Sequence, residues 1–353
     1  MAVIVGTPAS NVRLVDQPNQ SNTIIGDVNG TLDGVGGNDR IFAVEGNDIV
    51  IGDALVIGAS GGGGNDLVYG GDGVDTIYGD ARLTLRGLGG NDTLFAGSGG
   101  ADRQVMYGDA FALRGASGGN DRLEGGDEMS GDGASLSHAI GGRDTVDARD
   151  VIFGGDIRVY GDALGVMDTG SQGGNDILWA SSLGSNLIGD ARSIRDTSIG
   201  GDDQLNGGSG NDLLFGDARE DLLGAAVGGD DVLRGRAGVR DELFGDGPEL
   251  HGSSHGGDDD LYGGQGNDRL WGDGKLFQSA AGGEDRFHFG GSFGDDRILD
   301  FRHGEDTIDF TDLFQADLKT AVVGLNTVIS SIAGDSVTIL GYTGSLAGDI
   351  VFS

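Results

Sequence analysis

The chain of 353 residues has no cysteine, three prolines and two tryptophans. Without cysteine, no disulfide can staple the fold, and three prolines exclude a collagen or a proline-rich linker. Basic residues are also few, with 22 Lys and Arg against 57 Asp and Glu, which gives a formal net charge of −35. No basic stripe is available to neutralise phosphates, so nucleic acid is excluded as a natural partner.

Long apolar runs are missing as well. The sequence contains no run of 18 apolar residues, so we expect no segment that spans a membrane and no membrane insertion. The first ten residues, Met1 to Ser10, lack the basic start and the long apolar stretch of a cleaved secretion signal. We therefore expect no cleaved N-terminal signal.

Glycine is the residue that the chain has in excess, at 74 of 353 positions, about three times its usual share. A Gly-Asp pair that follows an apolar residue or a short turn and opens a new segment recurs ten times, at steps of 23 to 30 residues. The ten pairs begin at Gly26, Gly52, Gly79, Gly108, Gly131, Gly161, Gly189, Gly216, Gly245 and Gly272. A disordered acidic chain needs no such register, so the spacing indicates a repeating fold.

Between the pairs run nonapeptides of the form Gly-Gly-x-Gly-x-Asp-x-apolar-x, most clearly at 61–69, 70–78, 207–215 and 263–271. The glycines allow turn conformations that are closed to other residues, and the last three positions form a short strand whose central side chain points inward. The predicted inward column is Ile41, Val50, Val68, Ile77, Leu94, Leu123, Val146, Ile152, Leu178, Leu205, Leu214, Leu233, Leu243, Leu261 and Leu270. The pattern predicts a parallel β-solenoid.

The repeat length of about 27 residues exceeds the 18 residues of two nonapeptides. Each coil therefore has either three sides or two sides and a long loop, and we favour three. The third segment follows the Gly-Asp pair and carries a recurrent apolar residue that we expect to pack inward. These residues are Leu55, Leu83, Leu113, Leu136, Leu164, Ile194, Leu222, Leu250 and Leu276.

The aspartates of the turns suit calcium, a hard cation that takes six to eight oxygen ligands from carboxylates and backbone carbonyls. The candidate turn ligands are Asp39, Asp48, Asp66, Asp75, Asp92, Asp102, Asp121, Asp144, Asp176, Asp203, Asp212, Asp231, Asp241, Asp259, Asp268 and Asp285. A second column comes from the Gly-Asp pairs: Asp53, Asp80, Asp109, Asp162, Asp190, Asp217, Asp246 and Asp273. This second column either binds metal at the third corner or serves as a hydrogen-bonding turn residue.

Two copies of the repeat are damaged. In 180–188 we read Asn186 in place of the aspartate, and 125–133 reads as two segments compressed into one, which explains the 23-residue step. We expect these coils to bind calcium weakly or not at all.

The repeat stops near residue 285, and seven of the 14 phenylalanines lie in the last 69 residues. An open solenoid end needs a cap over its apolar surface and unpaired strand edges. We therefore divide the chain into an N-terminal cap or extension at 1–25, a calcium-binding solenoid at 26–285, and a C-terminal cap at 286–353.

The nonapeptides resemble the hemolysin-type calcium-binding repeats of RTX proteins. The segments 287–289, 296–301, 304–310, 337–341 and 349–353 resemble the C-terminal end of serralysin-type proteins. The resemblance implies a right-handed parallel β-roll or β-helix that folds on calcium outside the cell. It also implies an uncleaved C-terminal signal, read by a type I secretion machinery, and an extracellular or cell-surface location.

No catalytic constellation stands out. The His-Glu-x-x-His motif of zinc proteases is absent, and His251 and His255, although spaced like metal ligands on a helix, sit among Gly and Ser and read as loop residues. We expect a secreted calcium-binding structural protein, not an enzyme, that self-assembles into a surface layer, matrix or filament. The alternatives are a calcium-dependent adhesin or binding module, and the non-catalytic secretion module of an extracellular hydrolase.

Overall fold

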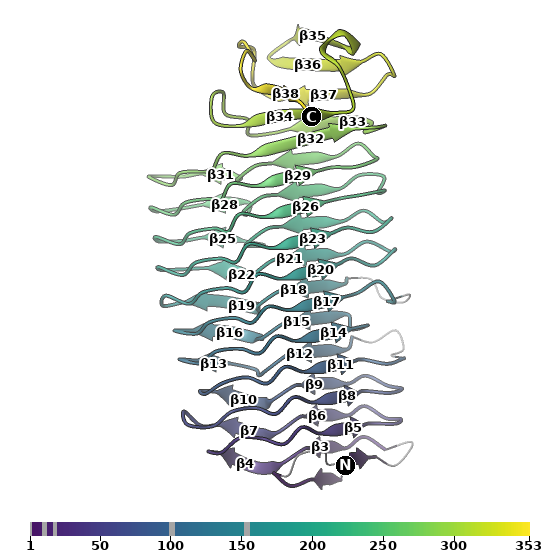
Figure 1. Ribbon diagram of the computed structural model, residues 1–353, viewed down its shortest axis with the longest axis vertical. Coiled ribbons are helices and arrows are strands. Elements are labelled where there is room, and N and C mark those ends of the chain that lie inside the picture. Colours follow the sequence, from purple (N-terminus) through teal and green to yellow (C-terminus); the bar gives the residue numbers. More distant parts are fainter. Residues whose placement is uncertain (1, 9–12, 17–19, 99–102, 152–155) are drawn as a thin grey trace.

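The computed structural model describes residues 2–8, 13–16, 20–98, 103–151 and 156–353. The chain forms a tall stack of coils (Figure 1), and each coil contributes one short strand to each of three sheets. The described residues contain no α-helix, and their one helical turn is the 3-10 helix η1 (Gln315–Asp317). None of the described segments is a helix long and apolar enough to cross a bilayer. The expected all-β parallel solenoid with coils of about 27 residues is confirmed.

We name the three sheets A, B and C. Sheet A contains, in spatial order, β1 (Val3–Val5), β3 (Thr23–Ile25), β6 (Ile49–Ile51), β9 (Thr76–Tyr78), β12 (Val105–Tyr107), β15 (Glu128–Ser130), β18 (Arg158–Tyr160), β21 (Asn186–Ile188), β24 (Leu213–Phe215), β27 (Glu242–Phe244), β30 (Arg269–Trp271), β33 (Asp295–Ile298), β37 (Ser336–Ile339), β36 (Asn326–Ser331) and β35 (Leu318–Val323).

Sheet B contains β2 (Arg13–Val15), β5 (Arg40–Phe42), β8 (Leu67–Tyr69), β11 (Thr93–Phe95), β14 (Arg122–Glu124), β17 (Thr145–Asp147), β20 (Ile177–Trp179), β23 (Gln204–Asn206), β26 (Val232–Arg234), β29 (Asp260–Tyr262), β32 (Arg286–Gly290), β34 (Thr307–Thr311) and β38 (Ile350–Phe352). Sheet C contains β4 (Val28–Leu32), β7 (Ala54–Ile57), β10 (Ala81–Leu85), β13 (Leu113–Arg114), β16 (Gly133–Ser137), β19 (Ala163–Asp168), β22 (Ala191–Ile194), β25 (Asp221–Leu222), β28 (Glu249–Leu250) and β31 (Lys275–Leu276).

Sheets A and B enclose the main core. Their strands stack in register, so that Ile77 pairs with Met106 in sheet A and Val68 pairs with Leu94 in sheet B. All of the central residues expected to point inward are fully buried, apart from Ile152, which lies outside the described residues. A strand of three residues is long enough here, because only its middle side chain enters this core.

Sheet C has a separate core, and here the sequence prediction was partly wrong. Leu113, Leu136, Ile194, Leu222 and Leu250 are buried as expected. In the longer strands, however, the buried residues are Ile57, Leu85 and Met167, which pair in register with the members of that column. The predicted Leu55, Leu83 and Leu164 lie elsewhere.

Irregular strand pairing explains this difference. The register shifts between Ala81 and Thr84 of β10 and between Gly133 and Ser135 of β16, and a shift of one residue turns the following side chains to the other face. Leu83 is 50% exposed. Leu55 and Leu164 pack against a secondary row of side chains on sheet A that includes Tyr78 and Tyr160.

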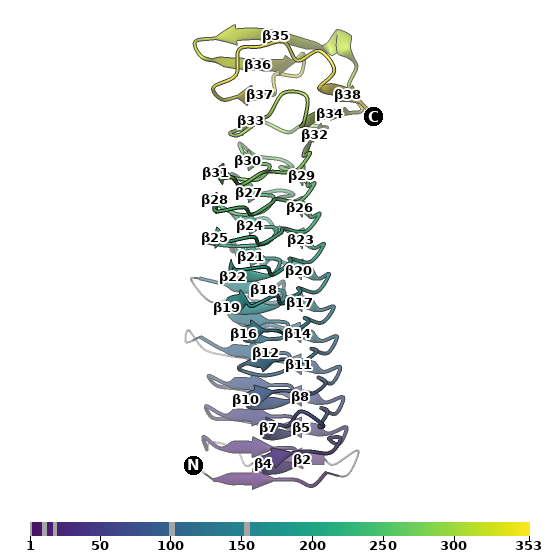
Figure 2. The ribbon, with the colours of Figure 1, turned by 90° about the vertical axis from the view of Figure 1, so that its left-hand side faces the viewer.

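The two ends of the stack differ. Residues before 26 contribute β1, β2 and β3, of which β1 and β3 stack as neighbours in sheet A. At the other end β32, β34 and β38 continue sheet B, β33 and β37 continue sheet A, and the antiparallel strands β36 and β35 lie over the end of the stack (Figure 2). The buried rings of Phe287, Phe289, Phe293 and Phe310 fill this region.

Candidate metal centre

One aspartate directly precedes every strand of sheet B from β5 to β38, and we call this set column B. Its members are Asp39, Asp66, Asp92, Asp121, Asp144, Asp176, Asp203, Asp231, Asp259, Asp285, Asp306 and Asp349, each at most 3% exposed. The carboxylates form a ladder between coils: the Asp66 backbone N–H donates to Oδ1 of Asp92 at 2.7 Å, and the Asp92 N–H donates to Oδ1 of Asp121 at 2.7 Å. The ladder fixes each carboxylate in place.

In most members of column B the other carboxylate oxygen is buried without a hydrogen-bond partner. This holds for Oδ2 of Asp66, Asp92, Asp121, Asp144, Asp176, Asp203, Asp231 and Asp259. A buried polar atom without a partner costs free energy, and a buried anionic oxygen costs far more. A row of such oxygens is the donor set that a hard cation requires.

The aspartates of the Gly-Asp pairs form a second buried row, which we call column C. Its members are Asp27, Asp53, Asp80, Asp109, Asp132, Asp162, Asp190, Asp217, Asp246 and Asp273. Each accepts a hydrogen bond from a glycine N–H in the turn that leads to sheet B; Gly64 donates to Asp53 at 2.8 Å and Gly90 donates to Asp80 at 2.9 Å.

Column C therefore does serve as a hydrogen-bonding turn residue, but only through part of each carboxylate. Oδ1 of Asp53 and Asp80 and Oδ2 of Asp162 have no partner and face the same interior. Asp27 and Asp132 belong to this column and were missed as candidates, although their Gly-Asp pairs mark them.

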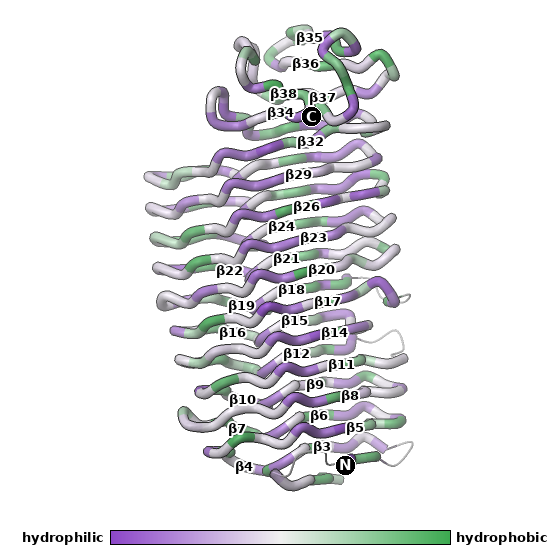
Figure 3. The backbone as a smooth tube through the Cα atoms, viewed as in Figure 1, coloured by the Kyte–Doolittle hydropathy of each residue, from purple (hydrophilic) through white to green (hydrophobic). Residues whose placement is uncertain are grey.

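Columns B and C run side by side: column C lies where the chain crosses from sheet A to sheet C, and column B lies where it crosses from sheet C to sheet B. A β-carbon on Gly108 would lie 2.2 Å from Oδ2 of Asp121 and 1.6 Å from the carbonyl oxygen of Gly131. The glycine of each pair is thus required by the carboxylate that fills its side-chain space. Figure 3 shows hydrophilic segments stacked where the chain passes between sheet C and the other two sheets.

The crowding changes the acidity of these groups. Burial, with the neighbouring carboxylates of Asp66 and Asp80, raises the pKa of Asp53 to about 12. Burial also raises the pKa of Asp66 to about 8, and those of Asp92 and Asp121 well above the usual 3.8. Stacked carboxylates at neutral pH must therefore hold either protons or cations.

At the C-terminal end of the stack, an arginine supplies the positive charge. Nη2 of Arg302 lies 2.8 Å from Asp273 of column C, and 3.8 Å and 3.6 Å from Asp285 and Asp306 of column B. A guanidinium group thus occupies the place between the two columns. Its positive charge lies close to carboxylates of both columns.

A third row, column A, precedes the strands of sheet A and is interrupted. Its aspartates are Asp48, Asp75, Asp212, Asp241 and Asp268, each directly before a strand, and Asp296, the second residue of β33. They form the same ladder; the Asp48 N–H donates to Oδ1 of Asp75 at 2.8 Å, and the Asp241 N–H donates to Oδ1 of Asp268 at 2.7 Å. The predicted ligand Asp102 belongs to a turn outside the described residues.

In the middle of column A, the structure differs from the sequence reading of the two damaged copies. The N–H of Ser185 donates to Oδ1 of Asp212 at 2.8 Å, so Ser185 takes the place of the aspartate, and Asn186 is the first residue of β21. The segment 125–133 keeps two separate strands, β15 and the start of β16, and only the turn at 125–127 is short. Asp127 there still accepts the N–H of Gln104 at 3.0 Å.

Ion pairs between side chains occur beside the interrupted part of column A. Arg103 lies 2.8 Å from Glu128 and 3.4 Å from Asp156, and Arg158 lies 3.7 Å from Glu128 and also pairs with Asp156. Arginine side chains therefore balance the acids where column A has few aspartates.

Five segments of the chain match the family model of the RTX calcium-binding nonapeptide repeat, at residues 22–54, 59–81, 84–100, 199–223 and 254–274. These segments are similar to RTX repeats. Between residues 100 and 199 the RTX model has no match, and this stretch contains the interrupted part of column A. The RTX repeats indicate a calcium-binding protein of the secreted type. No curated protein matches the chain.

All predicted ligands within the described residues belong to the three columns. The 23 aspartates are those named above as candidates without Asp102. What sequence reasoning missed is that columns B and C lie next to one another, although a strand of sheet C separates their members along the chain. The matched segments end at residue 274, so the serralysin-like C-terminal region stays a prediction.

Proposed function

We propose that the chain is an extracellular structural protein that folds when calcium enters columns B and C. The observation that carries the proposal is the row of buried carboxylate oxygens without partners, such as Oδ2 of Asp92 and Oδ1 of Asp80. Aspartates of both columns, with backbone carbonyls of the turns, are the residues that would hold the ions. Calcium would supply charge neutralisation there, and the chain supplies an ordered oxygen lattice.

The small apolar contribution of each coil supports a role for the metal in folding. A strand of three residues buries one side chain fully, which contributes about 1.5–3 kcal/mol. Ordering each backbone residue costs about 1–2 kcal/mol. The calcium-free chain therefore has little to offset a stack of buried like charges.

Calcium titration followed by circular dichroism tests this proposal. We expect a disordered spectrum in a chelator and a β spectrum when calcium is added in excess, whereas magnesium, with its stricter geometry, should not substitute. Identical spectra with and without calcium would rule the proposal out.

We further propose that the folded chains assemble end to end. Strands β1, β2 and β4 are the terminal strands of the three sheets among the described residues, and Val3, Val5 and Val15 of the first coil are 41–56% exposed. Terminal strands with apolar side chains are templates for pairing with another chain.

Sedimentation and electron microscopy in calcium test the assembly. A variant with Val3→Lys, Val5→Lys and Val15→Lys should remain monomeric, because the lysines place like charges at the stacking end. The control carries Val35→Lys and Val239→Lys, at side positions that are each 75% exposed. Only monomers of the wild-type chain at high concentration would refute end-to-end assembly.

For residues 286–353 we propose a second role as a type I secretion signal beside that of a cap. The support is the resemblance of this region to the serralysin-type end. Export of the full chain by a cell that carries a type I exporter, compared with a chain ending at residue 285, tests the role. Equal export of both would refute it.

A calcium-dependent adhesin is the second candidate, favoured by aromatic side chains along the outer face of sheet B. Phe42, Tyr69 and Phe95 stack in one row with ring centroids 5.1 Å and 4.9 Å apart, and Arg13 lies over Phe42. Such a row suits the faces of sugar rings. Retarded migration in polysaccharide gels that is lost on Tyr69→Ala would support this candidate.

A further inference from the structure

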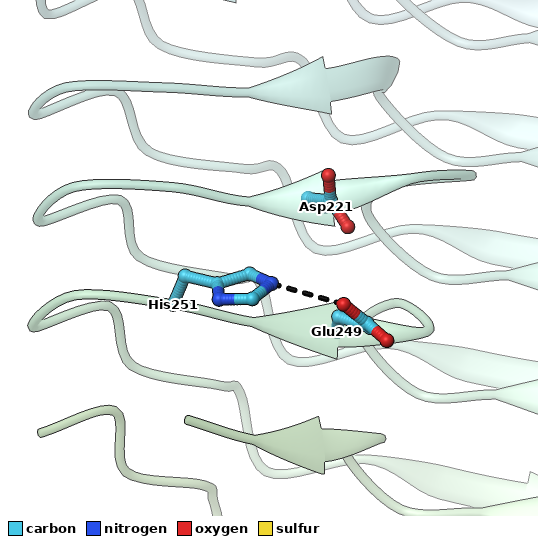
Figure 4. Close-up of side chains that lie close together, drawn as sticks. All are labelled: Asp221, Glu249 and His251. Atoms are coloured by element: carbon cyan, nitrogen blue, oxygen red, sulfur yellow. Dashed lines mark hydrogen bonds and ion pairs between the residues drawn. The ribbon is translucent and has the colours of Figure 1, made fainter. Parts of the chain in front are cut away.

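Three metal-binding side chains meet on sheet C, away from the aspartate columns. Asp221 of β25 and Glu249 of β28 are partners in strand register, and His251 follows Leu250 at the end of β28. Because alternate residues of a strand share a face, Glu249 and His251 lie on the face opposite the buried Leu250. Figure 4 shows the three side chains together across two neighbouring coils.

The distances within this group are those of a metal site. One ligand atom from each of Asp221, Glu249 and His251 lies within 4.8 Å of the other two. Nε2 of His251 is 3.1 Å from Oε2 of Glu249. The three side chains are partly buried, and the exposed fractions of the His251 and Glu249 side chains, 27% and 43%, leave a path for an ion from solvent.

The imidazole is held in place by the next coil. Its ring stacks on Phe277 with centroids 4.5 Å apart and planes 5° apart. On the other side the backbone N–H of His251 donates to the carbonyl of Leu222 in the preceding coil at 2.9 Å. A ring fixed in this way loses little freedom when it binds a ligand. The neighbouring Lys275 directs its ammonium to the same Phe277 ring, with Nζ 4.3 Å from the centroid.

Asp221 and Glu249 are carboxylates directly opposite each other on adjacent strands, an arrangement that destabilises a sheet. On its other side Glu249 is opposite Lys275, whose ammonium lies over the Phe277 ring. A dication between the two carboxylates would remove their repulsion and link two coils.

The donor set distinguishes this site from the calcium columns. Calcium prefers oxygen ligands only, whereas one imidazole nitrogen with two carboxylates suits zinc and its neighbours among the transition metals. We propose that Asp221, Glu249 and His251 bind one zinc ion that joins β25 and β28, independently of calcium.

The test is isothermal titration of zinc into the full, calcium-loaded chain, with calcium kept in large excess. We expect one tight zinc ion per chain. His251→Phe keeps a ring against Phe277 but removes the nitrogen ligand, so it should weaken zinc binding roughly tenfold or more. Asp221→Asn should weaken it as well. His255→Ala, a nearby histidine outside the group, should bind zinc like the wild type.

Circular dichroism in calcium verifies that each variant is folded. Cobalt offers a second readout, because a nitrogen ligand changes its visible absorption spectrum, and this change should be lost in His251→Phe. If His251→Phe binds zinc as tightly as the wild type, the ion resides in the aspartate columns and the proposal fails. Absence of tight zinc binding by the wild-type chain would overturn it equally.

Discussion

Oδ2 of Asp92 occupies the space that a side chain on Gly79 would need: a β-carbon built on Gly79 would lie 2.0 Å from that oxygen. The same β-carbon would lie 1.7 Å from the carbonyl oxygen of Gly108 in the next coil. The glycine that opens a coil and the aspartate that closes a turn are thus two parts of one packing unit. This relationship leads to the first prediction.

Replacing Gly79 with alanine should destabilise the calcium-loaded fold by about 1–3 kcal/mol, the usual cost of overpacking a rigid site. The clash involves backbone on one side, so no side-chain rotation relieves it. Thermal unfolding in calcium measures the effect. Gly34→Ala is the matched control, because a β-carbon on Gly34 would meet no atom within 4 Å and its φ is not positive. Equal midpoints for both variants would contradict the packing argument.

The second prediction concerns pH in the absence of calcium. Burial raises the pKa values of Asp66 and Asp241 to about 8 and that of Asp285 to about 9, against 3.8 for an ordinary aspartate. Between pH 3.8 and about 8 to 9 the folded state binds more protons than the unfolded state. The stability of the folded state therefore falls as pH rises through this range. The contribution is fully present below pH 3.8 and is lost as pH passes through about 8 to 9.

Acidification in a chelator should therefore increase the β signal, because protons partly replace the missing cations. Circular dichroism at a series of pH values between about 5 and 8 tests the direction. Calcium affinity should change in the opposite sense and rise with pH, with protons released on binding. A calcium-free chain that becomes more ordered as pH rises would contradict the assignment.

Much of this arrangement was predictable from the sequence, and the reason is periodicity. Residues such as Val68 and Leu94 recur at a fixed distance after each aspartate, so their inward direction follows from the repeat alone. The strands of sheet C vary in length from two to six residues. The buried residue of β10 is therefore Leu85 and not the predicted Leu83. The group around His251 was not predictable, because it joins residues of different coils and belongs to no repeat.

The third prediction tests the metal role of column B. Asp176→Asn preserves the size of the side chain and an oxygen for the Asp144 N–H, whose bond to Oδ1 is 2.6 Å long. It removes the charge and replaces the unpartnered Oδ2. We expect the apparent calcium affinity of the affected coils to fall roughly tenfold or more.

The calcium-free chain at acid pH should tolerate Asp176→Asn, because the amide resembles the protonated acid. Asp150→Asn, at an exposed position, is the control and should leave calcium binding unchanged. Calcium titration by calorimetry compares the calcium affinities of the Asp176→Asn and Asp150→Asn chains. An Asp176→Asn chain with wild-type calcium affinity would show that column B does not bind the ion.

The last prediction concerns Arg302, whose guanidinium stands where the other coils would hold a cation. Arg302→Met removes the charge but keeps the aliphatic stem, and it leaves Asp273, Asp285 and Asp306 without their shared partner. Loss of one partner from a buried ion pair costs about 3–5 kcal/mol. The Arg302 side chain is 23% exposed, so we expect the lower end of that range.

Added calcium should restore part of the stability of Arg302→Met, because an ion can enter between the two columns in place of the guanidinium. Calorimetry should then detect one more calcium ion per chain than in the wild type. Arg286→Met, at an exposed position of β32, is the control and should change neither the midpoint nor the ion count. If Arg302→Met is destabilised without gaining calcium, the arginine acts only as a structural ion-pair partner. Gain of the extra ion would mean that guanidinium and calcium neutralise the same carboxylates.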